Sequence, residues 1–129
     1  MSVRRLPSAA LALAACACAG GAPVVEPVAT VDGAQRELYW VDRSPYNILG
    51  PQPCEPGIVT AEYVIGDNGR VRDVDIVASR PRLPKNEYAV KNELWERRFD
   101  PGPENSQQHA IRVIEDFRID CGPGRPKWR

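Results

Sequence analysis

The chain has 129 residues, of which 17 are Lys or Arg and 17 are Asp or Glu, so its formal net charge at neutral pH is zero. Nucleic-acid binding relies on an excess of basic groups, so this balance gives no support to a nucleic-acid partner. The length suffices for one small domain with a thin hydrophobic core.

The first 15 residues have the form of a secretory signal. Two Arg precede an apolar run at residues 6–15, and this run is too short to cross a bilayer, which takes about 20 residues. The run ends in Leu-Ala-Ala-Cys16, which resembles the lipobox of bacterial lipoproteins. The resemblance implies cleavage before Cys16 and palmitate-type acylation of its thiol. Ordinary secretion, with cleavage after an Ala-x-Ala-like site such as Ala17-Cys18-Ala19, is the alternative.

A lipid at Cys16 would anchor the protein to a membrane. Each buried CH₂ contributes about 0.8 kcal/mol, so the three acyl chains that the lipoprotein resemblance implies would hold firmly. By the same resemblance, Ala17 in place of Asp after the lipidated residue directs the protein to the outer membrane, where we expect it on the periplasmic face. Residues 16–35 are rich in Ala, Gly and Pro, a composition typical of a flexible tether.

Residues 36–121 are predicted to form one domain, followed by a disordered basic tail at residues 122–129. Residues 36–42 are compatible with an additional strand or with a short helix, because their periodicity does not separate the two. Cys54 and Cys121 are the two Cys outside the signal region, and an oxidising periplasm favours a disulfide between them. Two lone thiols are an alternative. A metal site is disfavoured, because the chain has a single His and no Cys-x-x-Cys spacing.

Residues 57–81 carry the clearest pattern of the chain, two alternating apolar runs joined by a turn. Strand side chains alternate with period two, which places one apolar set of the first run on a single face. This set consists of Val59, Ala61, Tyr63 and Ile65. The turn at residues 66–69, Gly-Asp-Asn-Gly, is rich in residues that tolerate positive φ angles. The apolar phase shifts in the second run, which predicts a bulge or a strand start near Arg72, with Val74 and Ile76 in the core.

The pattern of residues 57–81 resembles the C-terminal domain of TonB-family proteins, which are periplasmic modules of Gram-negative bacteria. Residues 98–101, Arg-Phe-Asp-Pro, resemble the motif that ends the helix of that family, and residues 111–119 lie where its last strand is expected. The resemblance implies an α+β fold with the connectivity β-β-α-β. We therefore expect a small three-stranded antiparallel sheet in the order 2-1-3, with one helix packed across it.

The helix is expected between two prolines and a polar loop. Pro81 and Pro84 interrupt regular structure, and Asn86 is the predicted cap of a helix that runs to about Arg98. A narrow apolar stripe with Trp95 at its edge is formed by Val90, Leu94 and the aliphatic stem of Arg97. Residues 100–109 are predicted to be a loop.

The last strand, residues 111–119, places Glu115 among apolar positions of one face. Glu115 is interpreted as the partner of a nearby Arg at the sheet margin, such as Arg70, Arg72 or Arg112, or else as a polar anchor for a ligand. In the order 2-1-3 this strand is an unpaired edge, to which an extended peptide adds through main-chain hydrogen bonds. The predicted peptide-binding residues are Ile111, Arg112, Val113, Ile114, Glu115, Asp116 and Phe117.

Catalysis is not expected, because no nucleophile-base pair, carboxylate pair or phosphate-binding loop is present in the sequence. Asp67, Asp73 and Asp75 cluster around the hairpin, where solvent-exposed Asp is ordinary, and His109 has no Ser or Cys partner in view. We therefore predict no enzyme activity, no cofactor, no metal and no small-molecule substrate.

Two hypotheses for function remain. The TonB resemblance implies a periplasmic binding module that captures a peptide of an envelope protein or of a TonB-dependent transporter along the last strand, linked to transport across the outer membrane. No apolar run is long enough for the membrane helix that would meet an inner-membrane proton channel. The alternative is an adaptor lipoprotein that scaffolds an envelope complex without peptide capture, through the Arg-rich turn at residues 80–85 or the tail at residues 122–129.

Overall fold

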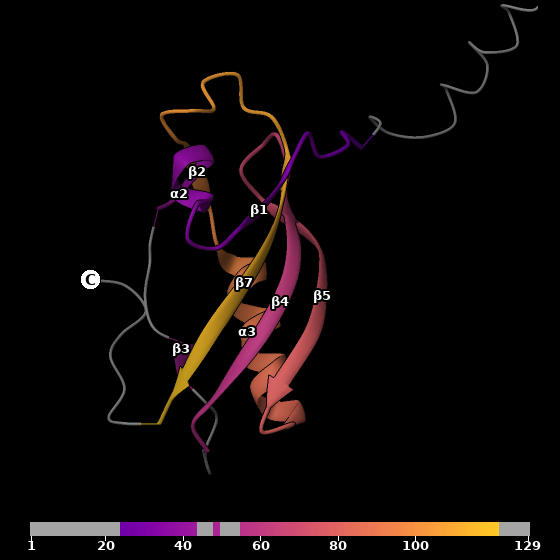
Figure 1. Cartoon of the computed structure of the whole chain (residues 1–129), viewed down its shortest axis with the longest axis vertical. Helices are drawn as coiled ribbons and strands as arrows, with labels where there is room; N and C mark the ends of the chain where they lie inside the picture. Colours follow the sequence, from indigo (N-terminus) through magenta and orange to yellow (C-terminus); the bar gives the residue numbers. More distant parts are fainter. Residues whose placement is uncertain (1–23, 44–47, 50–54, 122–129) are drawn as a thin grey trace, which may run out of the picture.

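The computed structural model describes residues 24–43, 48–49 and 55–121. A curved sheet and one long helix form the body of the protein, and shorter elements lie at one side (Figure 1). The elements in chain order are β1 (Thr30–Asp32), α2 (Arg36–Tyr39), β2 (Trp40–Asp42), β3 (Ile48–Leu49), β4 (Gly57–Ile65), β5 (Val71–Arg80), α3 (Pro84–Glu96), β6 (Phe99–Pro101) and β7 (Ile111–Asp120).

The predicted hairpin is confirmed by the antiparallel pair β4 and β5. The connecting turn closes through the Gly69 N–H, which donates to the Gly66 carbonyl at 2.9 Å, and the Gly66 N–H, which donates to the Arg70 carbonyl at 2.9 Å. Of the four turn residues only Gly69 has a positive φ, of 79°. A Cβ at Gly69 would also lie 2.4 Å from the Phe99 carbonyl oxygen, so both backbone angle and space require glycine there.

Strand β5 is irregular at two places. Glu62 pairs with Asp75 and Val64 with Arg72, so that two β5 residues face one β4 residue, and a second register shift falls opposite Thr60 and Ala61. Asp73, in the first of these bulges, has a φ of 55°. The bulge predicted near Arg72 is therefore confirmed.

The sheet contains the predicted order of strands but extends beyond it. β7 pairs antiparallel with β4 without a break from Gly57↔Ile119 to Ile65↔Ile111, which gives the expected arrangement β5-β4-β7. On its other side, however, β7 pairs in parallel with β1 and with β3. The sheet is thus a mixed sheet of five strands, and the prediction of a three-stranded antiparallel sheet is wrong.

The added strands also change the predicted domain boundary. β1 lies within residues 16–35, which were predicted to be a flexible tether, yet it forms part of the sheet. Three residues with a single buried side chain carry too little periodicity to stand out in a segment rich in Ala, Gly and Pro. The folded unit therefore begins before residue 36.

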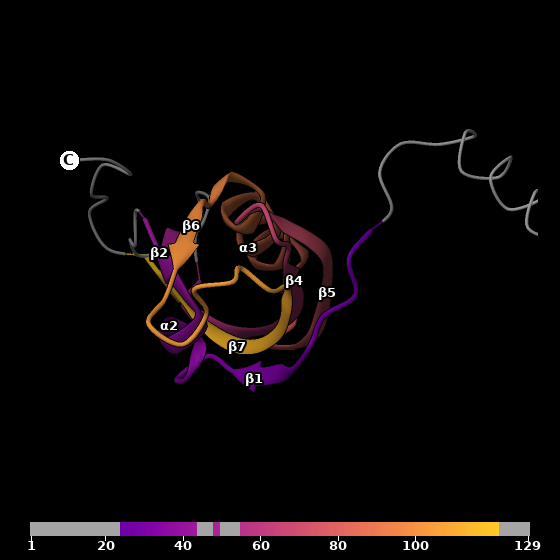
Figure 2. The same cartoon turned by 90° about the horizontal axis from the view of Figure 1, so that it is seen from above.

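Helix α3 covers one face of the sheet, which curves around it (Figure 2). The stripe predicted on the helix is confirmed, because Val90 and Leu94 are fully buried and Arg97 is 8% exposed. The predicted cap is wrong. Leu83 occupies the N-cap position and Pro84 opens the helix, while Asn86 lies inside the first turn and its amide donates to the Glu55 carbonyl at 3.1 Å. Proline is well suited to the first helical position because its fixed φ is helical and its missing N–H has no helical partner.

A second, two-stranded sheet forms beside the main one. β2 pairs antiparallel with β6, from Trp40↔Pro101 to Asp42↔Phe99. Residues 36–42 therefore form both of the elements considered for them, the one-turn helix α2 and then the strand β2. The stretch predicted as a loop, residues 100–109, begins as part of β6 rather than as irregular chain.

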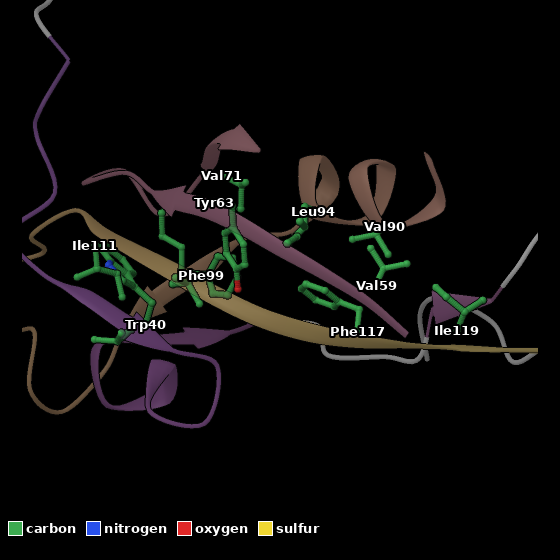
Figure 3. Packing of buried hydrophobic residues seen from close by; sticks show 14 residues of the cluster. Trp40, Val59, Tyr63, Val71, Val90, Leu94, Phe99, Ile111, Phe117 and Ile119 are labelled. Atoms are coloured by element: carbon green, nitrogen blue, oxygen red, sulfur yellow. The ribbon is translucent and has the colours of Figure 1, made fainter. Parts of the chain in front are cut away.

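The hydrophobic core lies between the sheet and α3 and extends under β2 (Figure 3). The predicted β4 face is confirmed, because its four residues are at most 1% exposed, and Val74 and Ile76 pack against this core. Trp40 is buried as well, and its indole N–H donates to the His109 carbonyl at 3.0 Å. Trp95 is 49% exposed and so lies outside the core.

Candidate functional site

The outer edge of β7 is the feature on which the predicted function depends, and it is not unpaired. β1 pairs with residues 112–114 and β3 with residues 119–120, at different positions along β7 (Figure 1). The expectation that the last strand is an open edge is therefore wrong. Between the two segments, residues 115–118 have no strand partner on this side within the part of the chain that the structure describes.

Main-chain groups alternate in direction along β7. The Arg112 N–H donates outward to the Ala29 carbonyl at 2.9 Å, and the Ile114 carbonyl accepts from the Gly33 N–H at 2.9 Å. Because alternate residues of a strand direct their main-chain groups to the same side, Asp116 and Arg118 also direct theirs outward. Residues 115–118 of β7 thus direct main-chain hydrogen-bonding groups outward at every second residue, as residues 112–114 do where β1 pairs with them.

A hollow of about 460 Å³ lies where β1 leaves the edge. It is lined by Asp32, Gly33, Ala34, Ile114, Glu115 and Asp116. Asp116 is exposed, and its carboxylate accepts a hydrogen bond from the Thr60 hydroxyl on β4 at 2.5 Å. Ile114 is 40% exposed on the same face. The edge therefore combines accessible main chain with a partly apolar outer surface.

The carboxylate of Glu115 is held beneath this edge by residues other than those predicted. The Tyr63 hydroxyl donates to Glu115 Oε1 at 2.6 Å, and Arg36 Nε lies 3.9 Å from the same oxygen. The candidate partners are occupied elsewhere, because Arg112 pairs with Glu62 at 3.3 Å and Arg72 with Asp73 at 2.7 Å. The prediction that Glu115 pairs with a nearby Arg is therefore confirmed, but the partner is Arg36 and not Arg70, Arg72 or Arg112. Glu115 shares its face of β7 with Phe117 and not with Arg112, which lies on the opposite face.

Burial of Tyr63 strengthens this contact. The pKa of the Tyr63 hydroxyl is raised well above its ordinary value, first by burial, and then by the negative charge of Glu115 and the hydrogen bond to it. The phenol therefore stays protonated and remains a hydrogen-bond donor to the carboxylate.

Arg36 connects the same cluster to the short elements α2 and β2. Its guanidinium donates to the Trp40 carbonyl at 2.7 Å and lies 5.2 Å from the centre of the Phe99 ring. Its side chain is 9% exposed. The sequence analysis did not identify Arg36. The signal that could have identified it is the spacing of four residues between Arg36 and Trp40, which brings two residues to the same side of a helical turn.

A second buried ion pair lies under the middle of β7. Arg97 Nη1 lies 3.1 Å from Asp42 Oδ2, with side-chain exposures of 7% and 4%. The Arg97 guanidinium also lies 5.6 Å from the centre of the Phe117 ring. The stem of Arg97 was expected in the apolar stripe, but the charged group is buried too, and Asp42 on β2 is the partner that the sequence did not reveal.

The sequence also drew attention to His109 and to three Asp around the hairpin. His109 Nε2 lies 3.1 Å from the Gln107 side-chain oxygen, and Asp67, Asp73 and Asp75 are exposed around the hairpin. No group of three or more His, Cys, Asp or Glu among the described residues could hold a metal ion.

The predicted cysteine sites are only partly within the described structure. Cys121 is disulfide-bonded. Its predicted partner Cys54 and the predicted lipid-attachment residue Cys16 lie outside the described residues, as does the tail at residues 122–129. No helix among the described residues has the length and apolarity needed to span a membrane.

Comparison with known proteins supports the fold. No family model matches the chain. The protein YkfC of Escherichia coli (strain K12) is 33% identical over 72 residues, which cover 51% of this chain, and the chain spans 19% of that protein. The solution NMR structure of the Pseudomonas aeruginosa TonB CTD matches 73% of this chain and 96% of its own length with a TM-score of 0.55 and 17% identity. The chain therefore has a TonB CTD-like α+β fold.

Proposed function

We propose that the chain is a non-catalytic binding module of the bacterial cell envelope that takes up an extended segment of another envelope protein as an additional strand on β7. A periplasmic segment of a TonB-dependent transporter is the partner that the fold favours. The observation that carries the proposal is the outer edge of β7, which pairs with two separate extended segments of its own chain.

The geometry of β7 supports strand addition in particular. Addition of a strand derives affinity from main-chain hydrogen bonds and specificity from pockets for alternate side chains. β7 offers the outward main-chain groups of Asp116 and Arg118, and the adjoining hollow of about 460 Å³ provides room for a side chain. No catalytic group is needed for this function.

A titration of the isotope-labelled full chain with synthetic peptides that copy periplasmic segments of outer-membrane transporters tests the proposal. We expect the amide signals of Asp116 and Arg118 to shift on binding. Asp116→Pro should abolish binding, because proline removes an outward N–H while such a position at a strand edge tolerates it. Thr60→Ala is the matched control, since it removes only the side-chain hydrogen bond to Asp116. Peptide binding that is unchanged in Asp116→Pro would contradict strand addition.

The envelope location rests on the lipobox-like sequence at Cys16 and on the TonB CTD-like fold. A lipid at Cys16 would hold the module at the periplasmic face of the outer membrane, close to transporters embedded there. In a host that processes lipoproteins, Cys16→Ala should abolish palmitate labelling, and Cys18→Ala should leave it unchanged. Labelling that persists in Cys16→Ala would exclude the proposed anchor.

A disulfide between Cys54 and Cys121 would tie the segment before β4 to the end of β7. The proposal is supported by the register partners Gly57 and Ile119, which lie three residues after Cys54 and two residues before Cys121 in the sequence. Peptide mapping by mass spectrometry without reduction should recover a fragment that joins Cys54 to Cys121. Recovery of Cys121 joined to another cysteine would refute this pairing.

A second candidate function, an adaptor in an envelope complex, is favoured by the exposed face of α3. Tyr88 is 66% exposed and Trp95 49% exposed, and residues seven apart lie on the same side of a helix. Arg80 and Arg82 are exposed just before the helix. If partners dissociate on replacement of both aromatic residues by Ala but remain bound to Asp116→Pro, the adaptor function is the correct one.

A further inference from the structure

The edge of β7 is covered by a segment of the same chain, and this segment has the properties of a ligand. The Val28 N–H donates to the Ala110 carbonyl, and the Arg112 N–H donates to the Ala29 carbonyl, each at 2.9 Å. The Gly33 N–H donates to the Ile114 carbonyl at the same distance. Residues 28–33 therefore follow β7, with the parallel strand β1 at residues 30–32 and a turn that begins at Gly33.

We infer that residues 28–33 are a built-in occupant of the binding edge, which a partner segment with the same side-chain pattern displaces. The inference rests on the proposed function and specifies the partner. It must be an extended peptide that runs parallel to β7 and carries an apolar residue two positions before a glycine.

The apolar position is defined by Val31. It is 8% exposed and belongs to the hydrophobic core cluster, whereas Thr30 and Asp32 on either side are exposed. A partner segment that replaces β1 must fill the place of the Val31 side chain, because an empty place would leave core residues without contacts. The two flanking positions face solvent and so place little restriction on the partner.

The glycine position is defined by Gly33. A Cβ there would lie 2.6 Å from Glu115 Cγ and 3.0 Å from Glu115 Cβ. Glu115 has little freedom to move aside, because Tyr63 donates a hydrogen bond to its carboxylate at 2.6 Å. Any residue with a side chain at this position of the partner would therefore collide with a fixed group.

Besides β7, the occupant has main-chain contacts with the start of α2, because the Gln35 N–H donates to the Asp32 carbonyl at 3.0 Å and the Arg36 N–H to the Gly33 carbonyl at 3.4 Å. β1 has three residues and in the described structure pairs with β7 alone. The chain that follows has contacts of its own, since Arg36 of α2 donates to the Trp40 carbonyl at 2.7 Å and lies against the Phe99 ring. Displacement up to Gly33 thus breaks the hydrogen bonds that the Gln35 and Arg36 N–H groups donate to the Asp32 and Gly33 carbonyls, and leaves the contacts of the Arg36 side chain.

Competition with an attached occupant lowers the apparent affinity for the partner. When only a fraction of molecules is open, the apparent Kd is the intrinsic Kd divided by that fraction. Loss of the Val31 contact should therefore raise the open fraction and tighten partner binding by the same factor.

The test uses the full chain and a fluorescent synthetic peptide that copies residues 28–33, Val-Ala-Thr-Val-Asp-Gly. We expect Val31→Asp to bind this peptide at least about tenfold more tightly than the unsubstituted chain, as a tenfold larger open fraction requires. Val24→Asp is the matched control, because Val24 is 63% exposed and precedes the paired residues. It should bind like the unsubstituted chain.

Hydrogen exchange shows whether the segment is released. The Arg112 amide, which donates to Ala29, should exchange faster in Val31→Asp, while the Val113 amide, directed toward β4 by alternation, should stay protected. Loss of protection at Arg112 alone identifies local release rather than unfolding. Unchanged exchange at Arg112 would overturn the inference.

Two further measurements test the pattern and the direction. A peptide ending in Ala instead of Gly should bind Val31→Asp at least about tenfold more weakly. A tenfold change in affinity needs only a small loss of binding free energy, which the collision of the Ala side chain with Glu115 should exceed. A nitroxide at the peptide N-terminus should broaden signals near Ala110 and leave those near Arg118 sharp. Equal binding of both peptides, or broadening at Arg118, would contradict the proposed partner pattern.

The outcomes separate this inference from the proposed function. If the unsubstituted chain and Val31→Asp bind the peptide equally, the built-in occupant is refuted and strand addition stands. If neither binds any peptide although exchange shows release in Val31→Asp, strand addition itself is refuted. Concentration-dependent dimerisation of Val31→Asp in place of peptide binding would show that a second copy, and not a partner protein, takes the edge.

Discussion

The two long edges of the sheet differ in how they are protected. β5 carries two register shifts against β4 and exposed charges at Asp73 and Asp75. β7 keeps an unbroken register with β4 and is covered by β1 and β3. Bulges, charges and covering segments are all ways in which a sheet edge is protected from pairing with other chains. The covering of β7 by short strands is the difference on which the proposed binding at β7 rests.

A buried ion pair packs against β7, and its loss should cause the largest change in stability. The buried pair of Asp42 and Arg97 lies against Phe117 of β7. Asp42→Ala should lower the free energy of unfolding by about 3–5 kcal/mol, because it removes a buried carboxylate that is paired with the buried Arg97. Urea unfolding measures the loss. Asp100→Ala, in the exposed pair with Arg43, is the control and should change stability little. Equal losses in the two variants would contradict a special support under β7.

The contact between Tyr63 and Glu115 should have the next largest effect. Tyr63→Phe removes a hydrogen bond to a partly buried carboxylate, which should cost about 1.5–3 kcal/mol. Thermal unfolding monitored by circular dichroism at neutral pH measures it. Val77→Ala on β5, at a position that is 54% exposed, is a control that should cost much less.

The same contact predicts a dependence of stability on pH. The pKa of Tyr63 is raised in the folded protein, so the unfolded chain loses this proton first as the pH rises. The contribution of Tyr63 is therefore complete below the ordinary tyrosine pKa of about 10 and declines above it. Unfolding measured between neutral and strongly alkaline pH should show a shallower decline in Tyr63→Phe than in the unsubstituted chain. Parallel declines would refute the raised pKa.

Two substitutions in the bulge of β5 should change stability by smaller amounts and in different directions. Asp73 has a φ of 55°, a conformation that a β-branched residue adopts only at a cost. Asp73→Val should destabilise the fold by about 1–2 kcal/mol, and Asp73→Gly should be neutral or stabilising. Chemical unfolding of both variants provides the comparison. If Asp73→Val instead stabilised the fold, the positive φ at residue 73 would not be needed, and β5 would be able to form a regular edge strand without the bulge.

The smallest effect is expected for the ion pair on the outer face of β4 and β7. Arg112 and Glu62 lie 3.3 Å apart with side chains about one third exposed, at 34% and 32%. Glu62→Gln should cost about 1 kcal/mol or less, because such pairs are screened by solvent. Urea unfolding at low and high salt should show this small difference disappear as salt rises. A larger loss of stability that does not depend on salt would contradict this, and would mean that the pair of Arg112 and Glu62 contributes substantially to the stability of the sheet.

Local patterns of the sequence predicted the parts of the fold that depend on local geometry. The period-two pattern of β4 identified Val59, Ala61 and Tyr63 as core residues, because a strand fixes which side chains share a face. The phase shift near Arg72 identified the bulge for the same reason. The N-cap was misplaced because Asn86 has the composition of a cap, while Pro84 fixes where the helix begins.

The candidate site was harder to predict because its contacts are distant in sequence. β1 has one buried side chain, Val31, and its place in the sheet is decided by β7 and not by its own pattern. Glu115 was recognised as unusual among apolar neighbours, but its partner Arg36 lies in a segment whose secondary structure the sequence left open. The pairing of β7 with β4 was predicted correctly, whereas the pairing of β7 with β1 and β3 on its other side was not.

Binding at β7 is tested most directly by an amide shift map of β7 and β5 in one titration with transporter-derived peptides. We expect Asp116 and Arg118 on β7 to respond and Asp75 and Val77 on β5 not to respond. A response confined to β5, or the absence of any response on β7 once residues 28–33 are released by Val31→Asp, would contradict the claim that β7 is the binding edge.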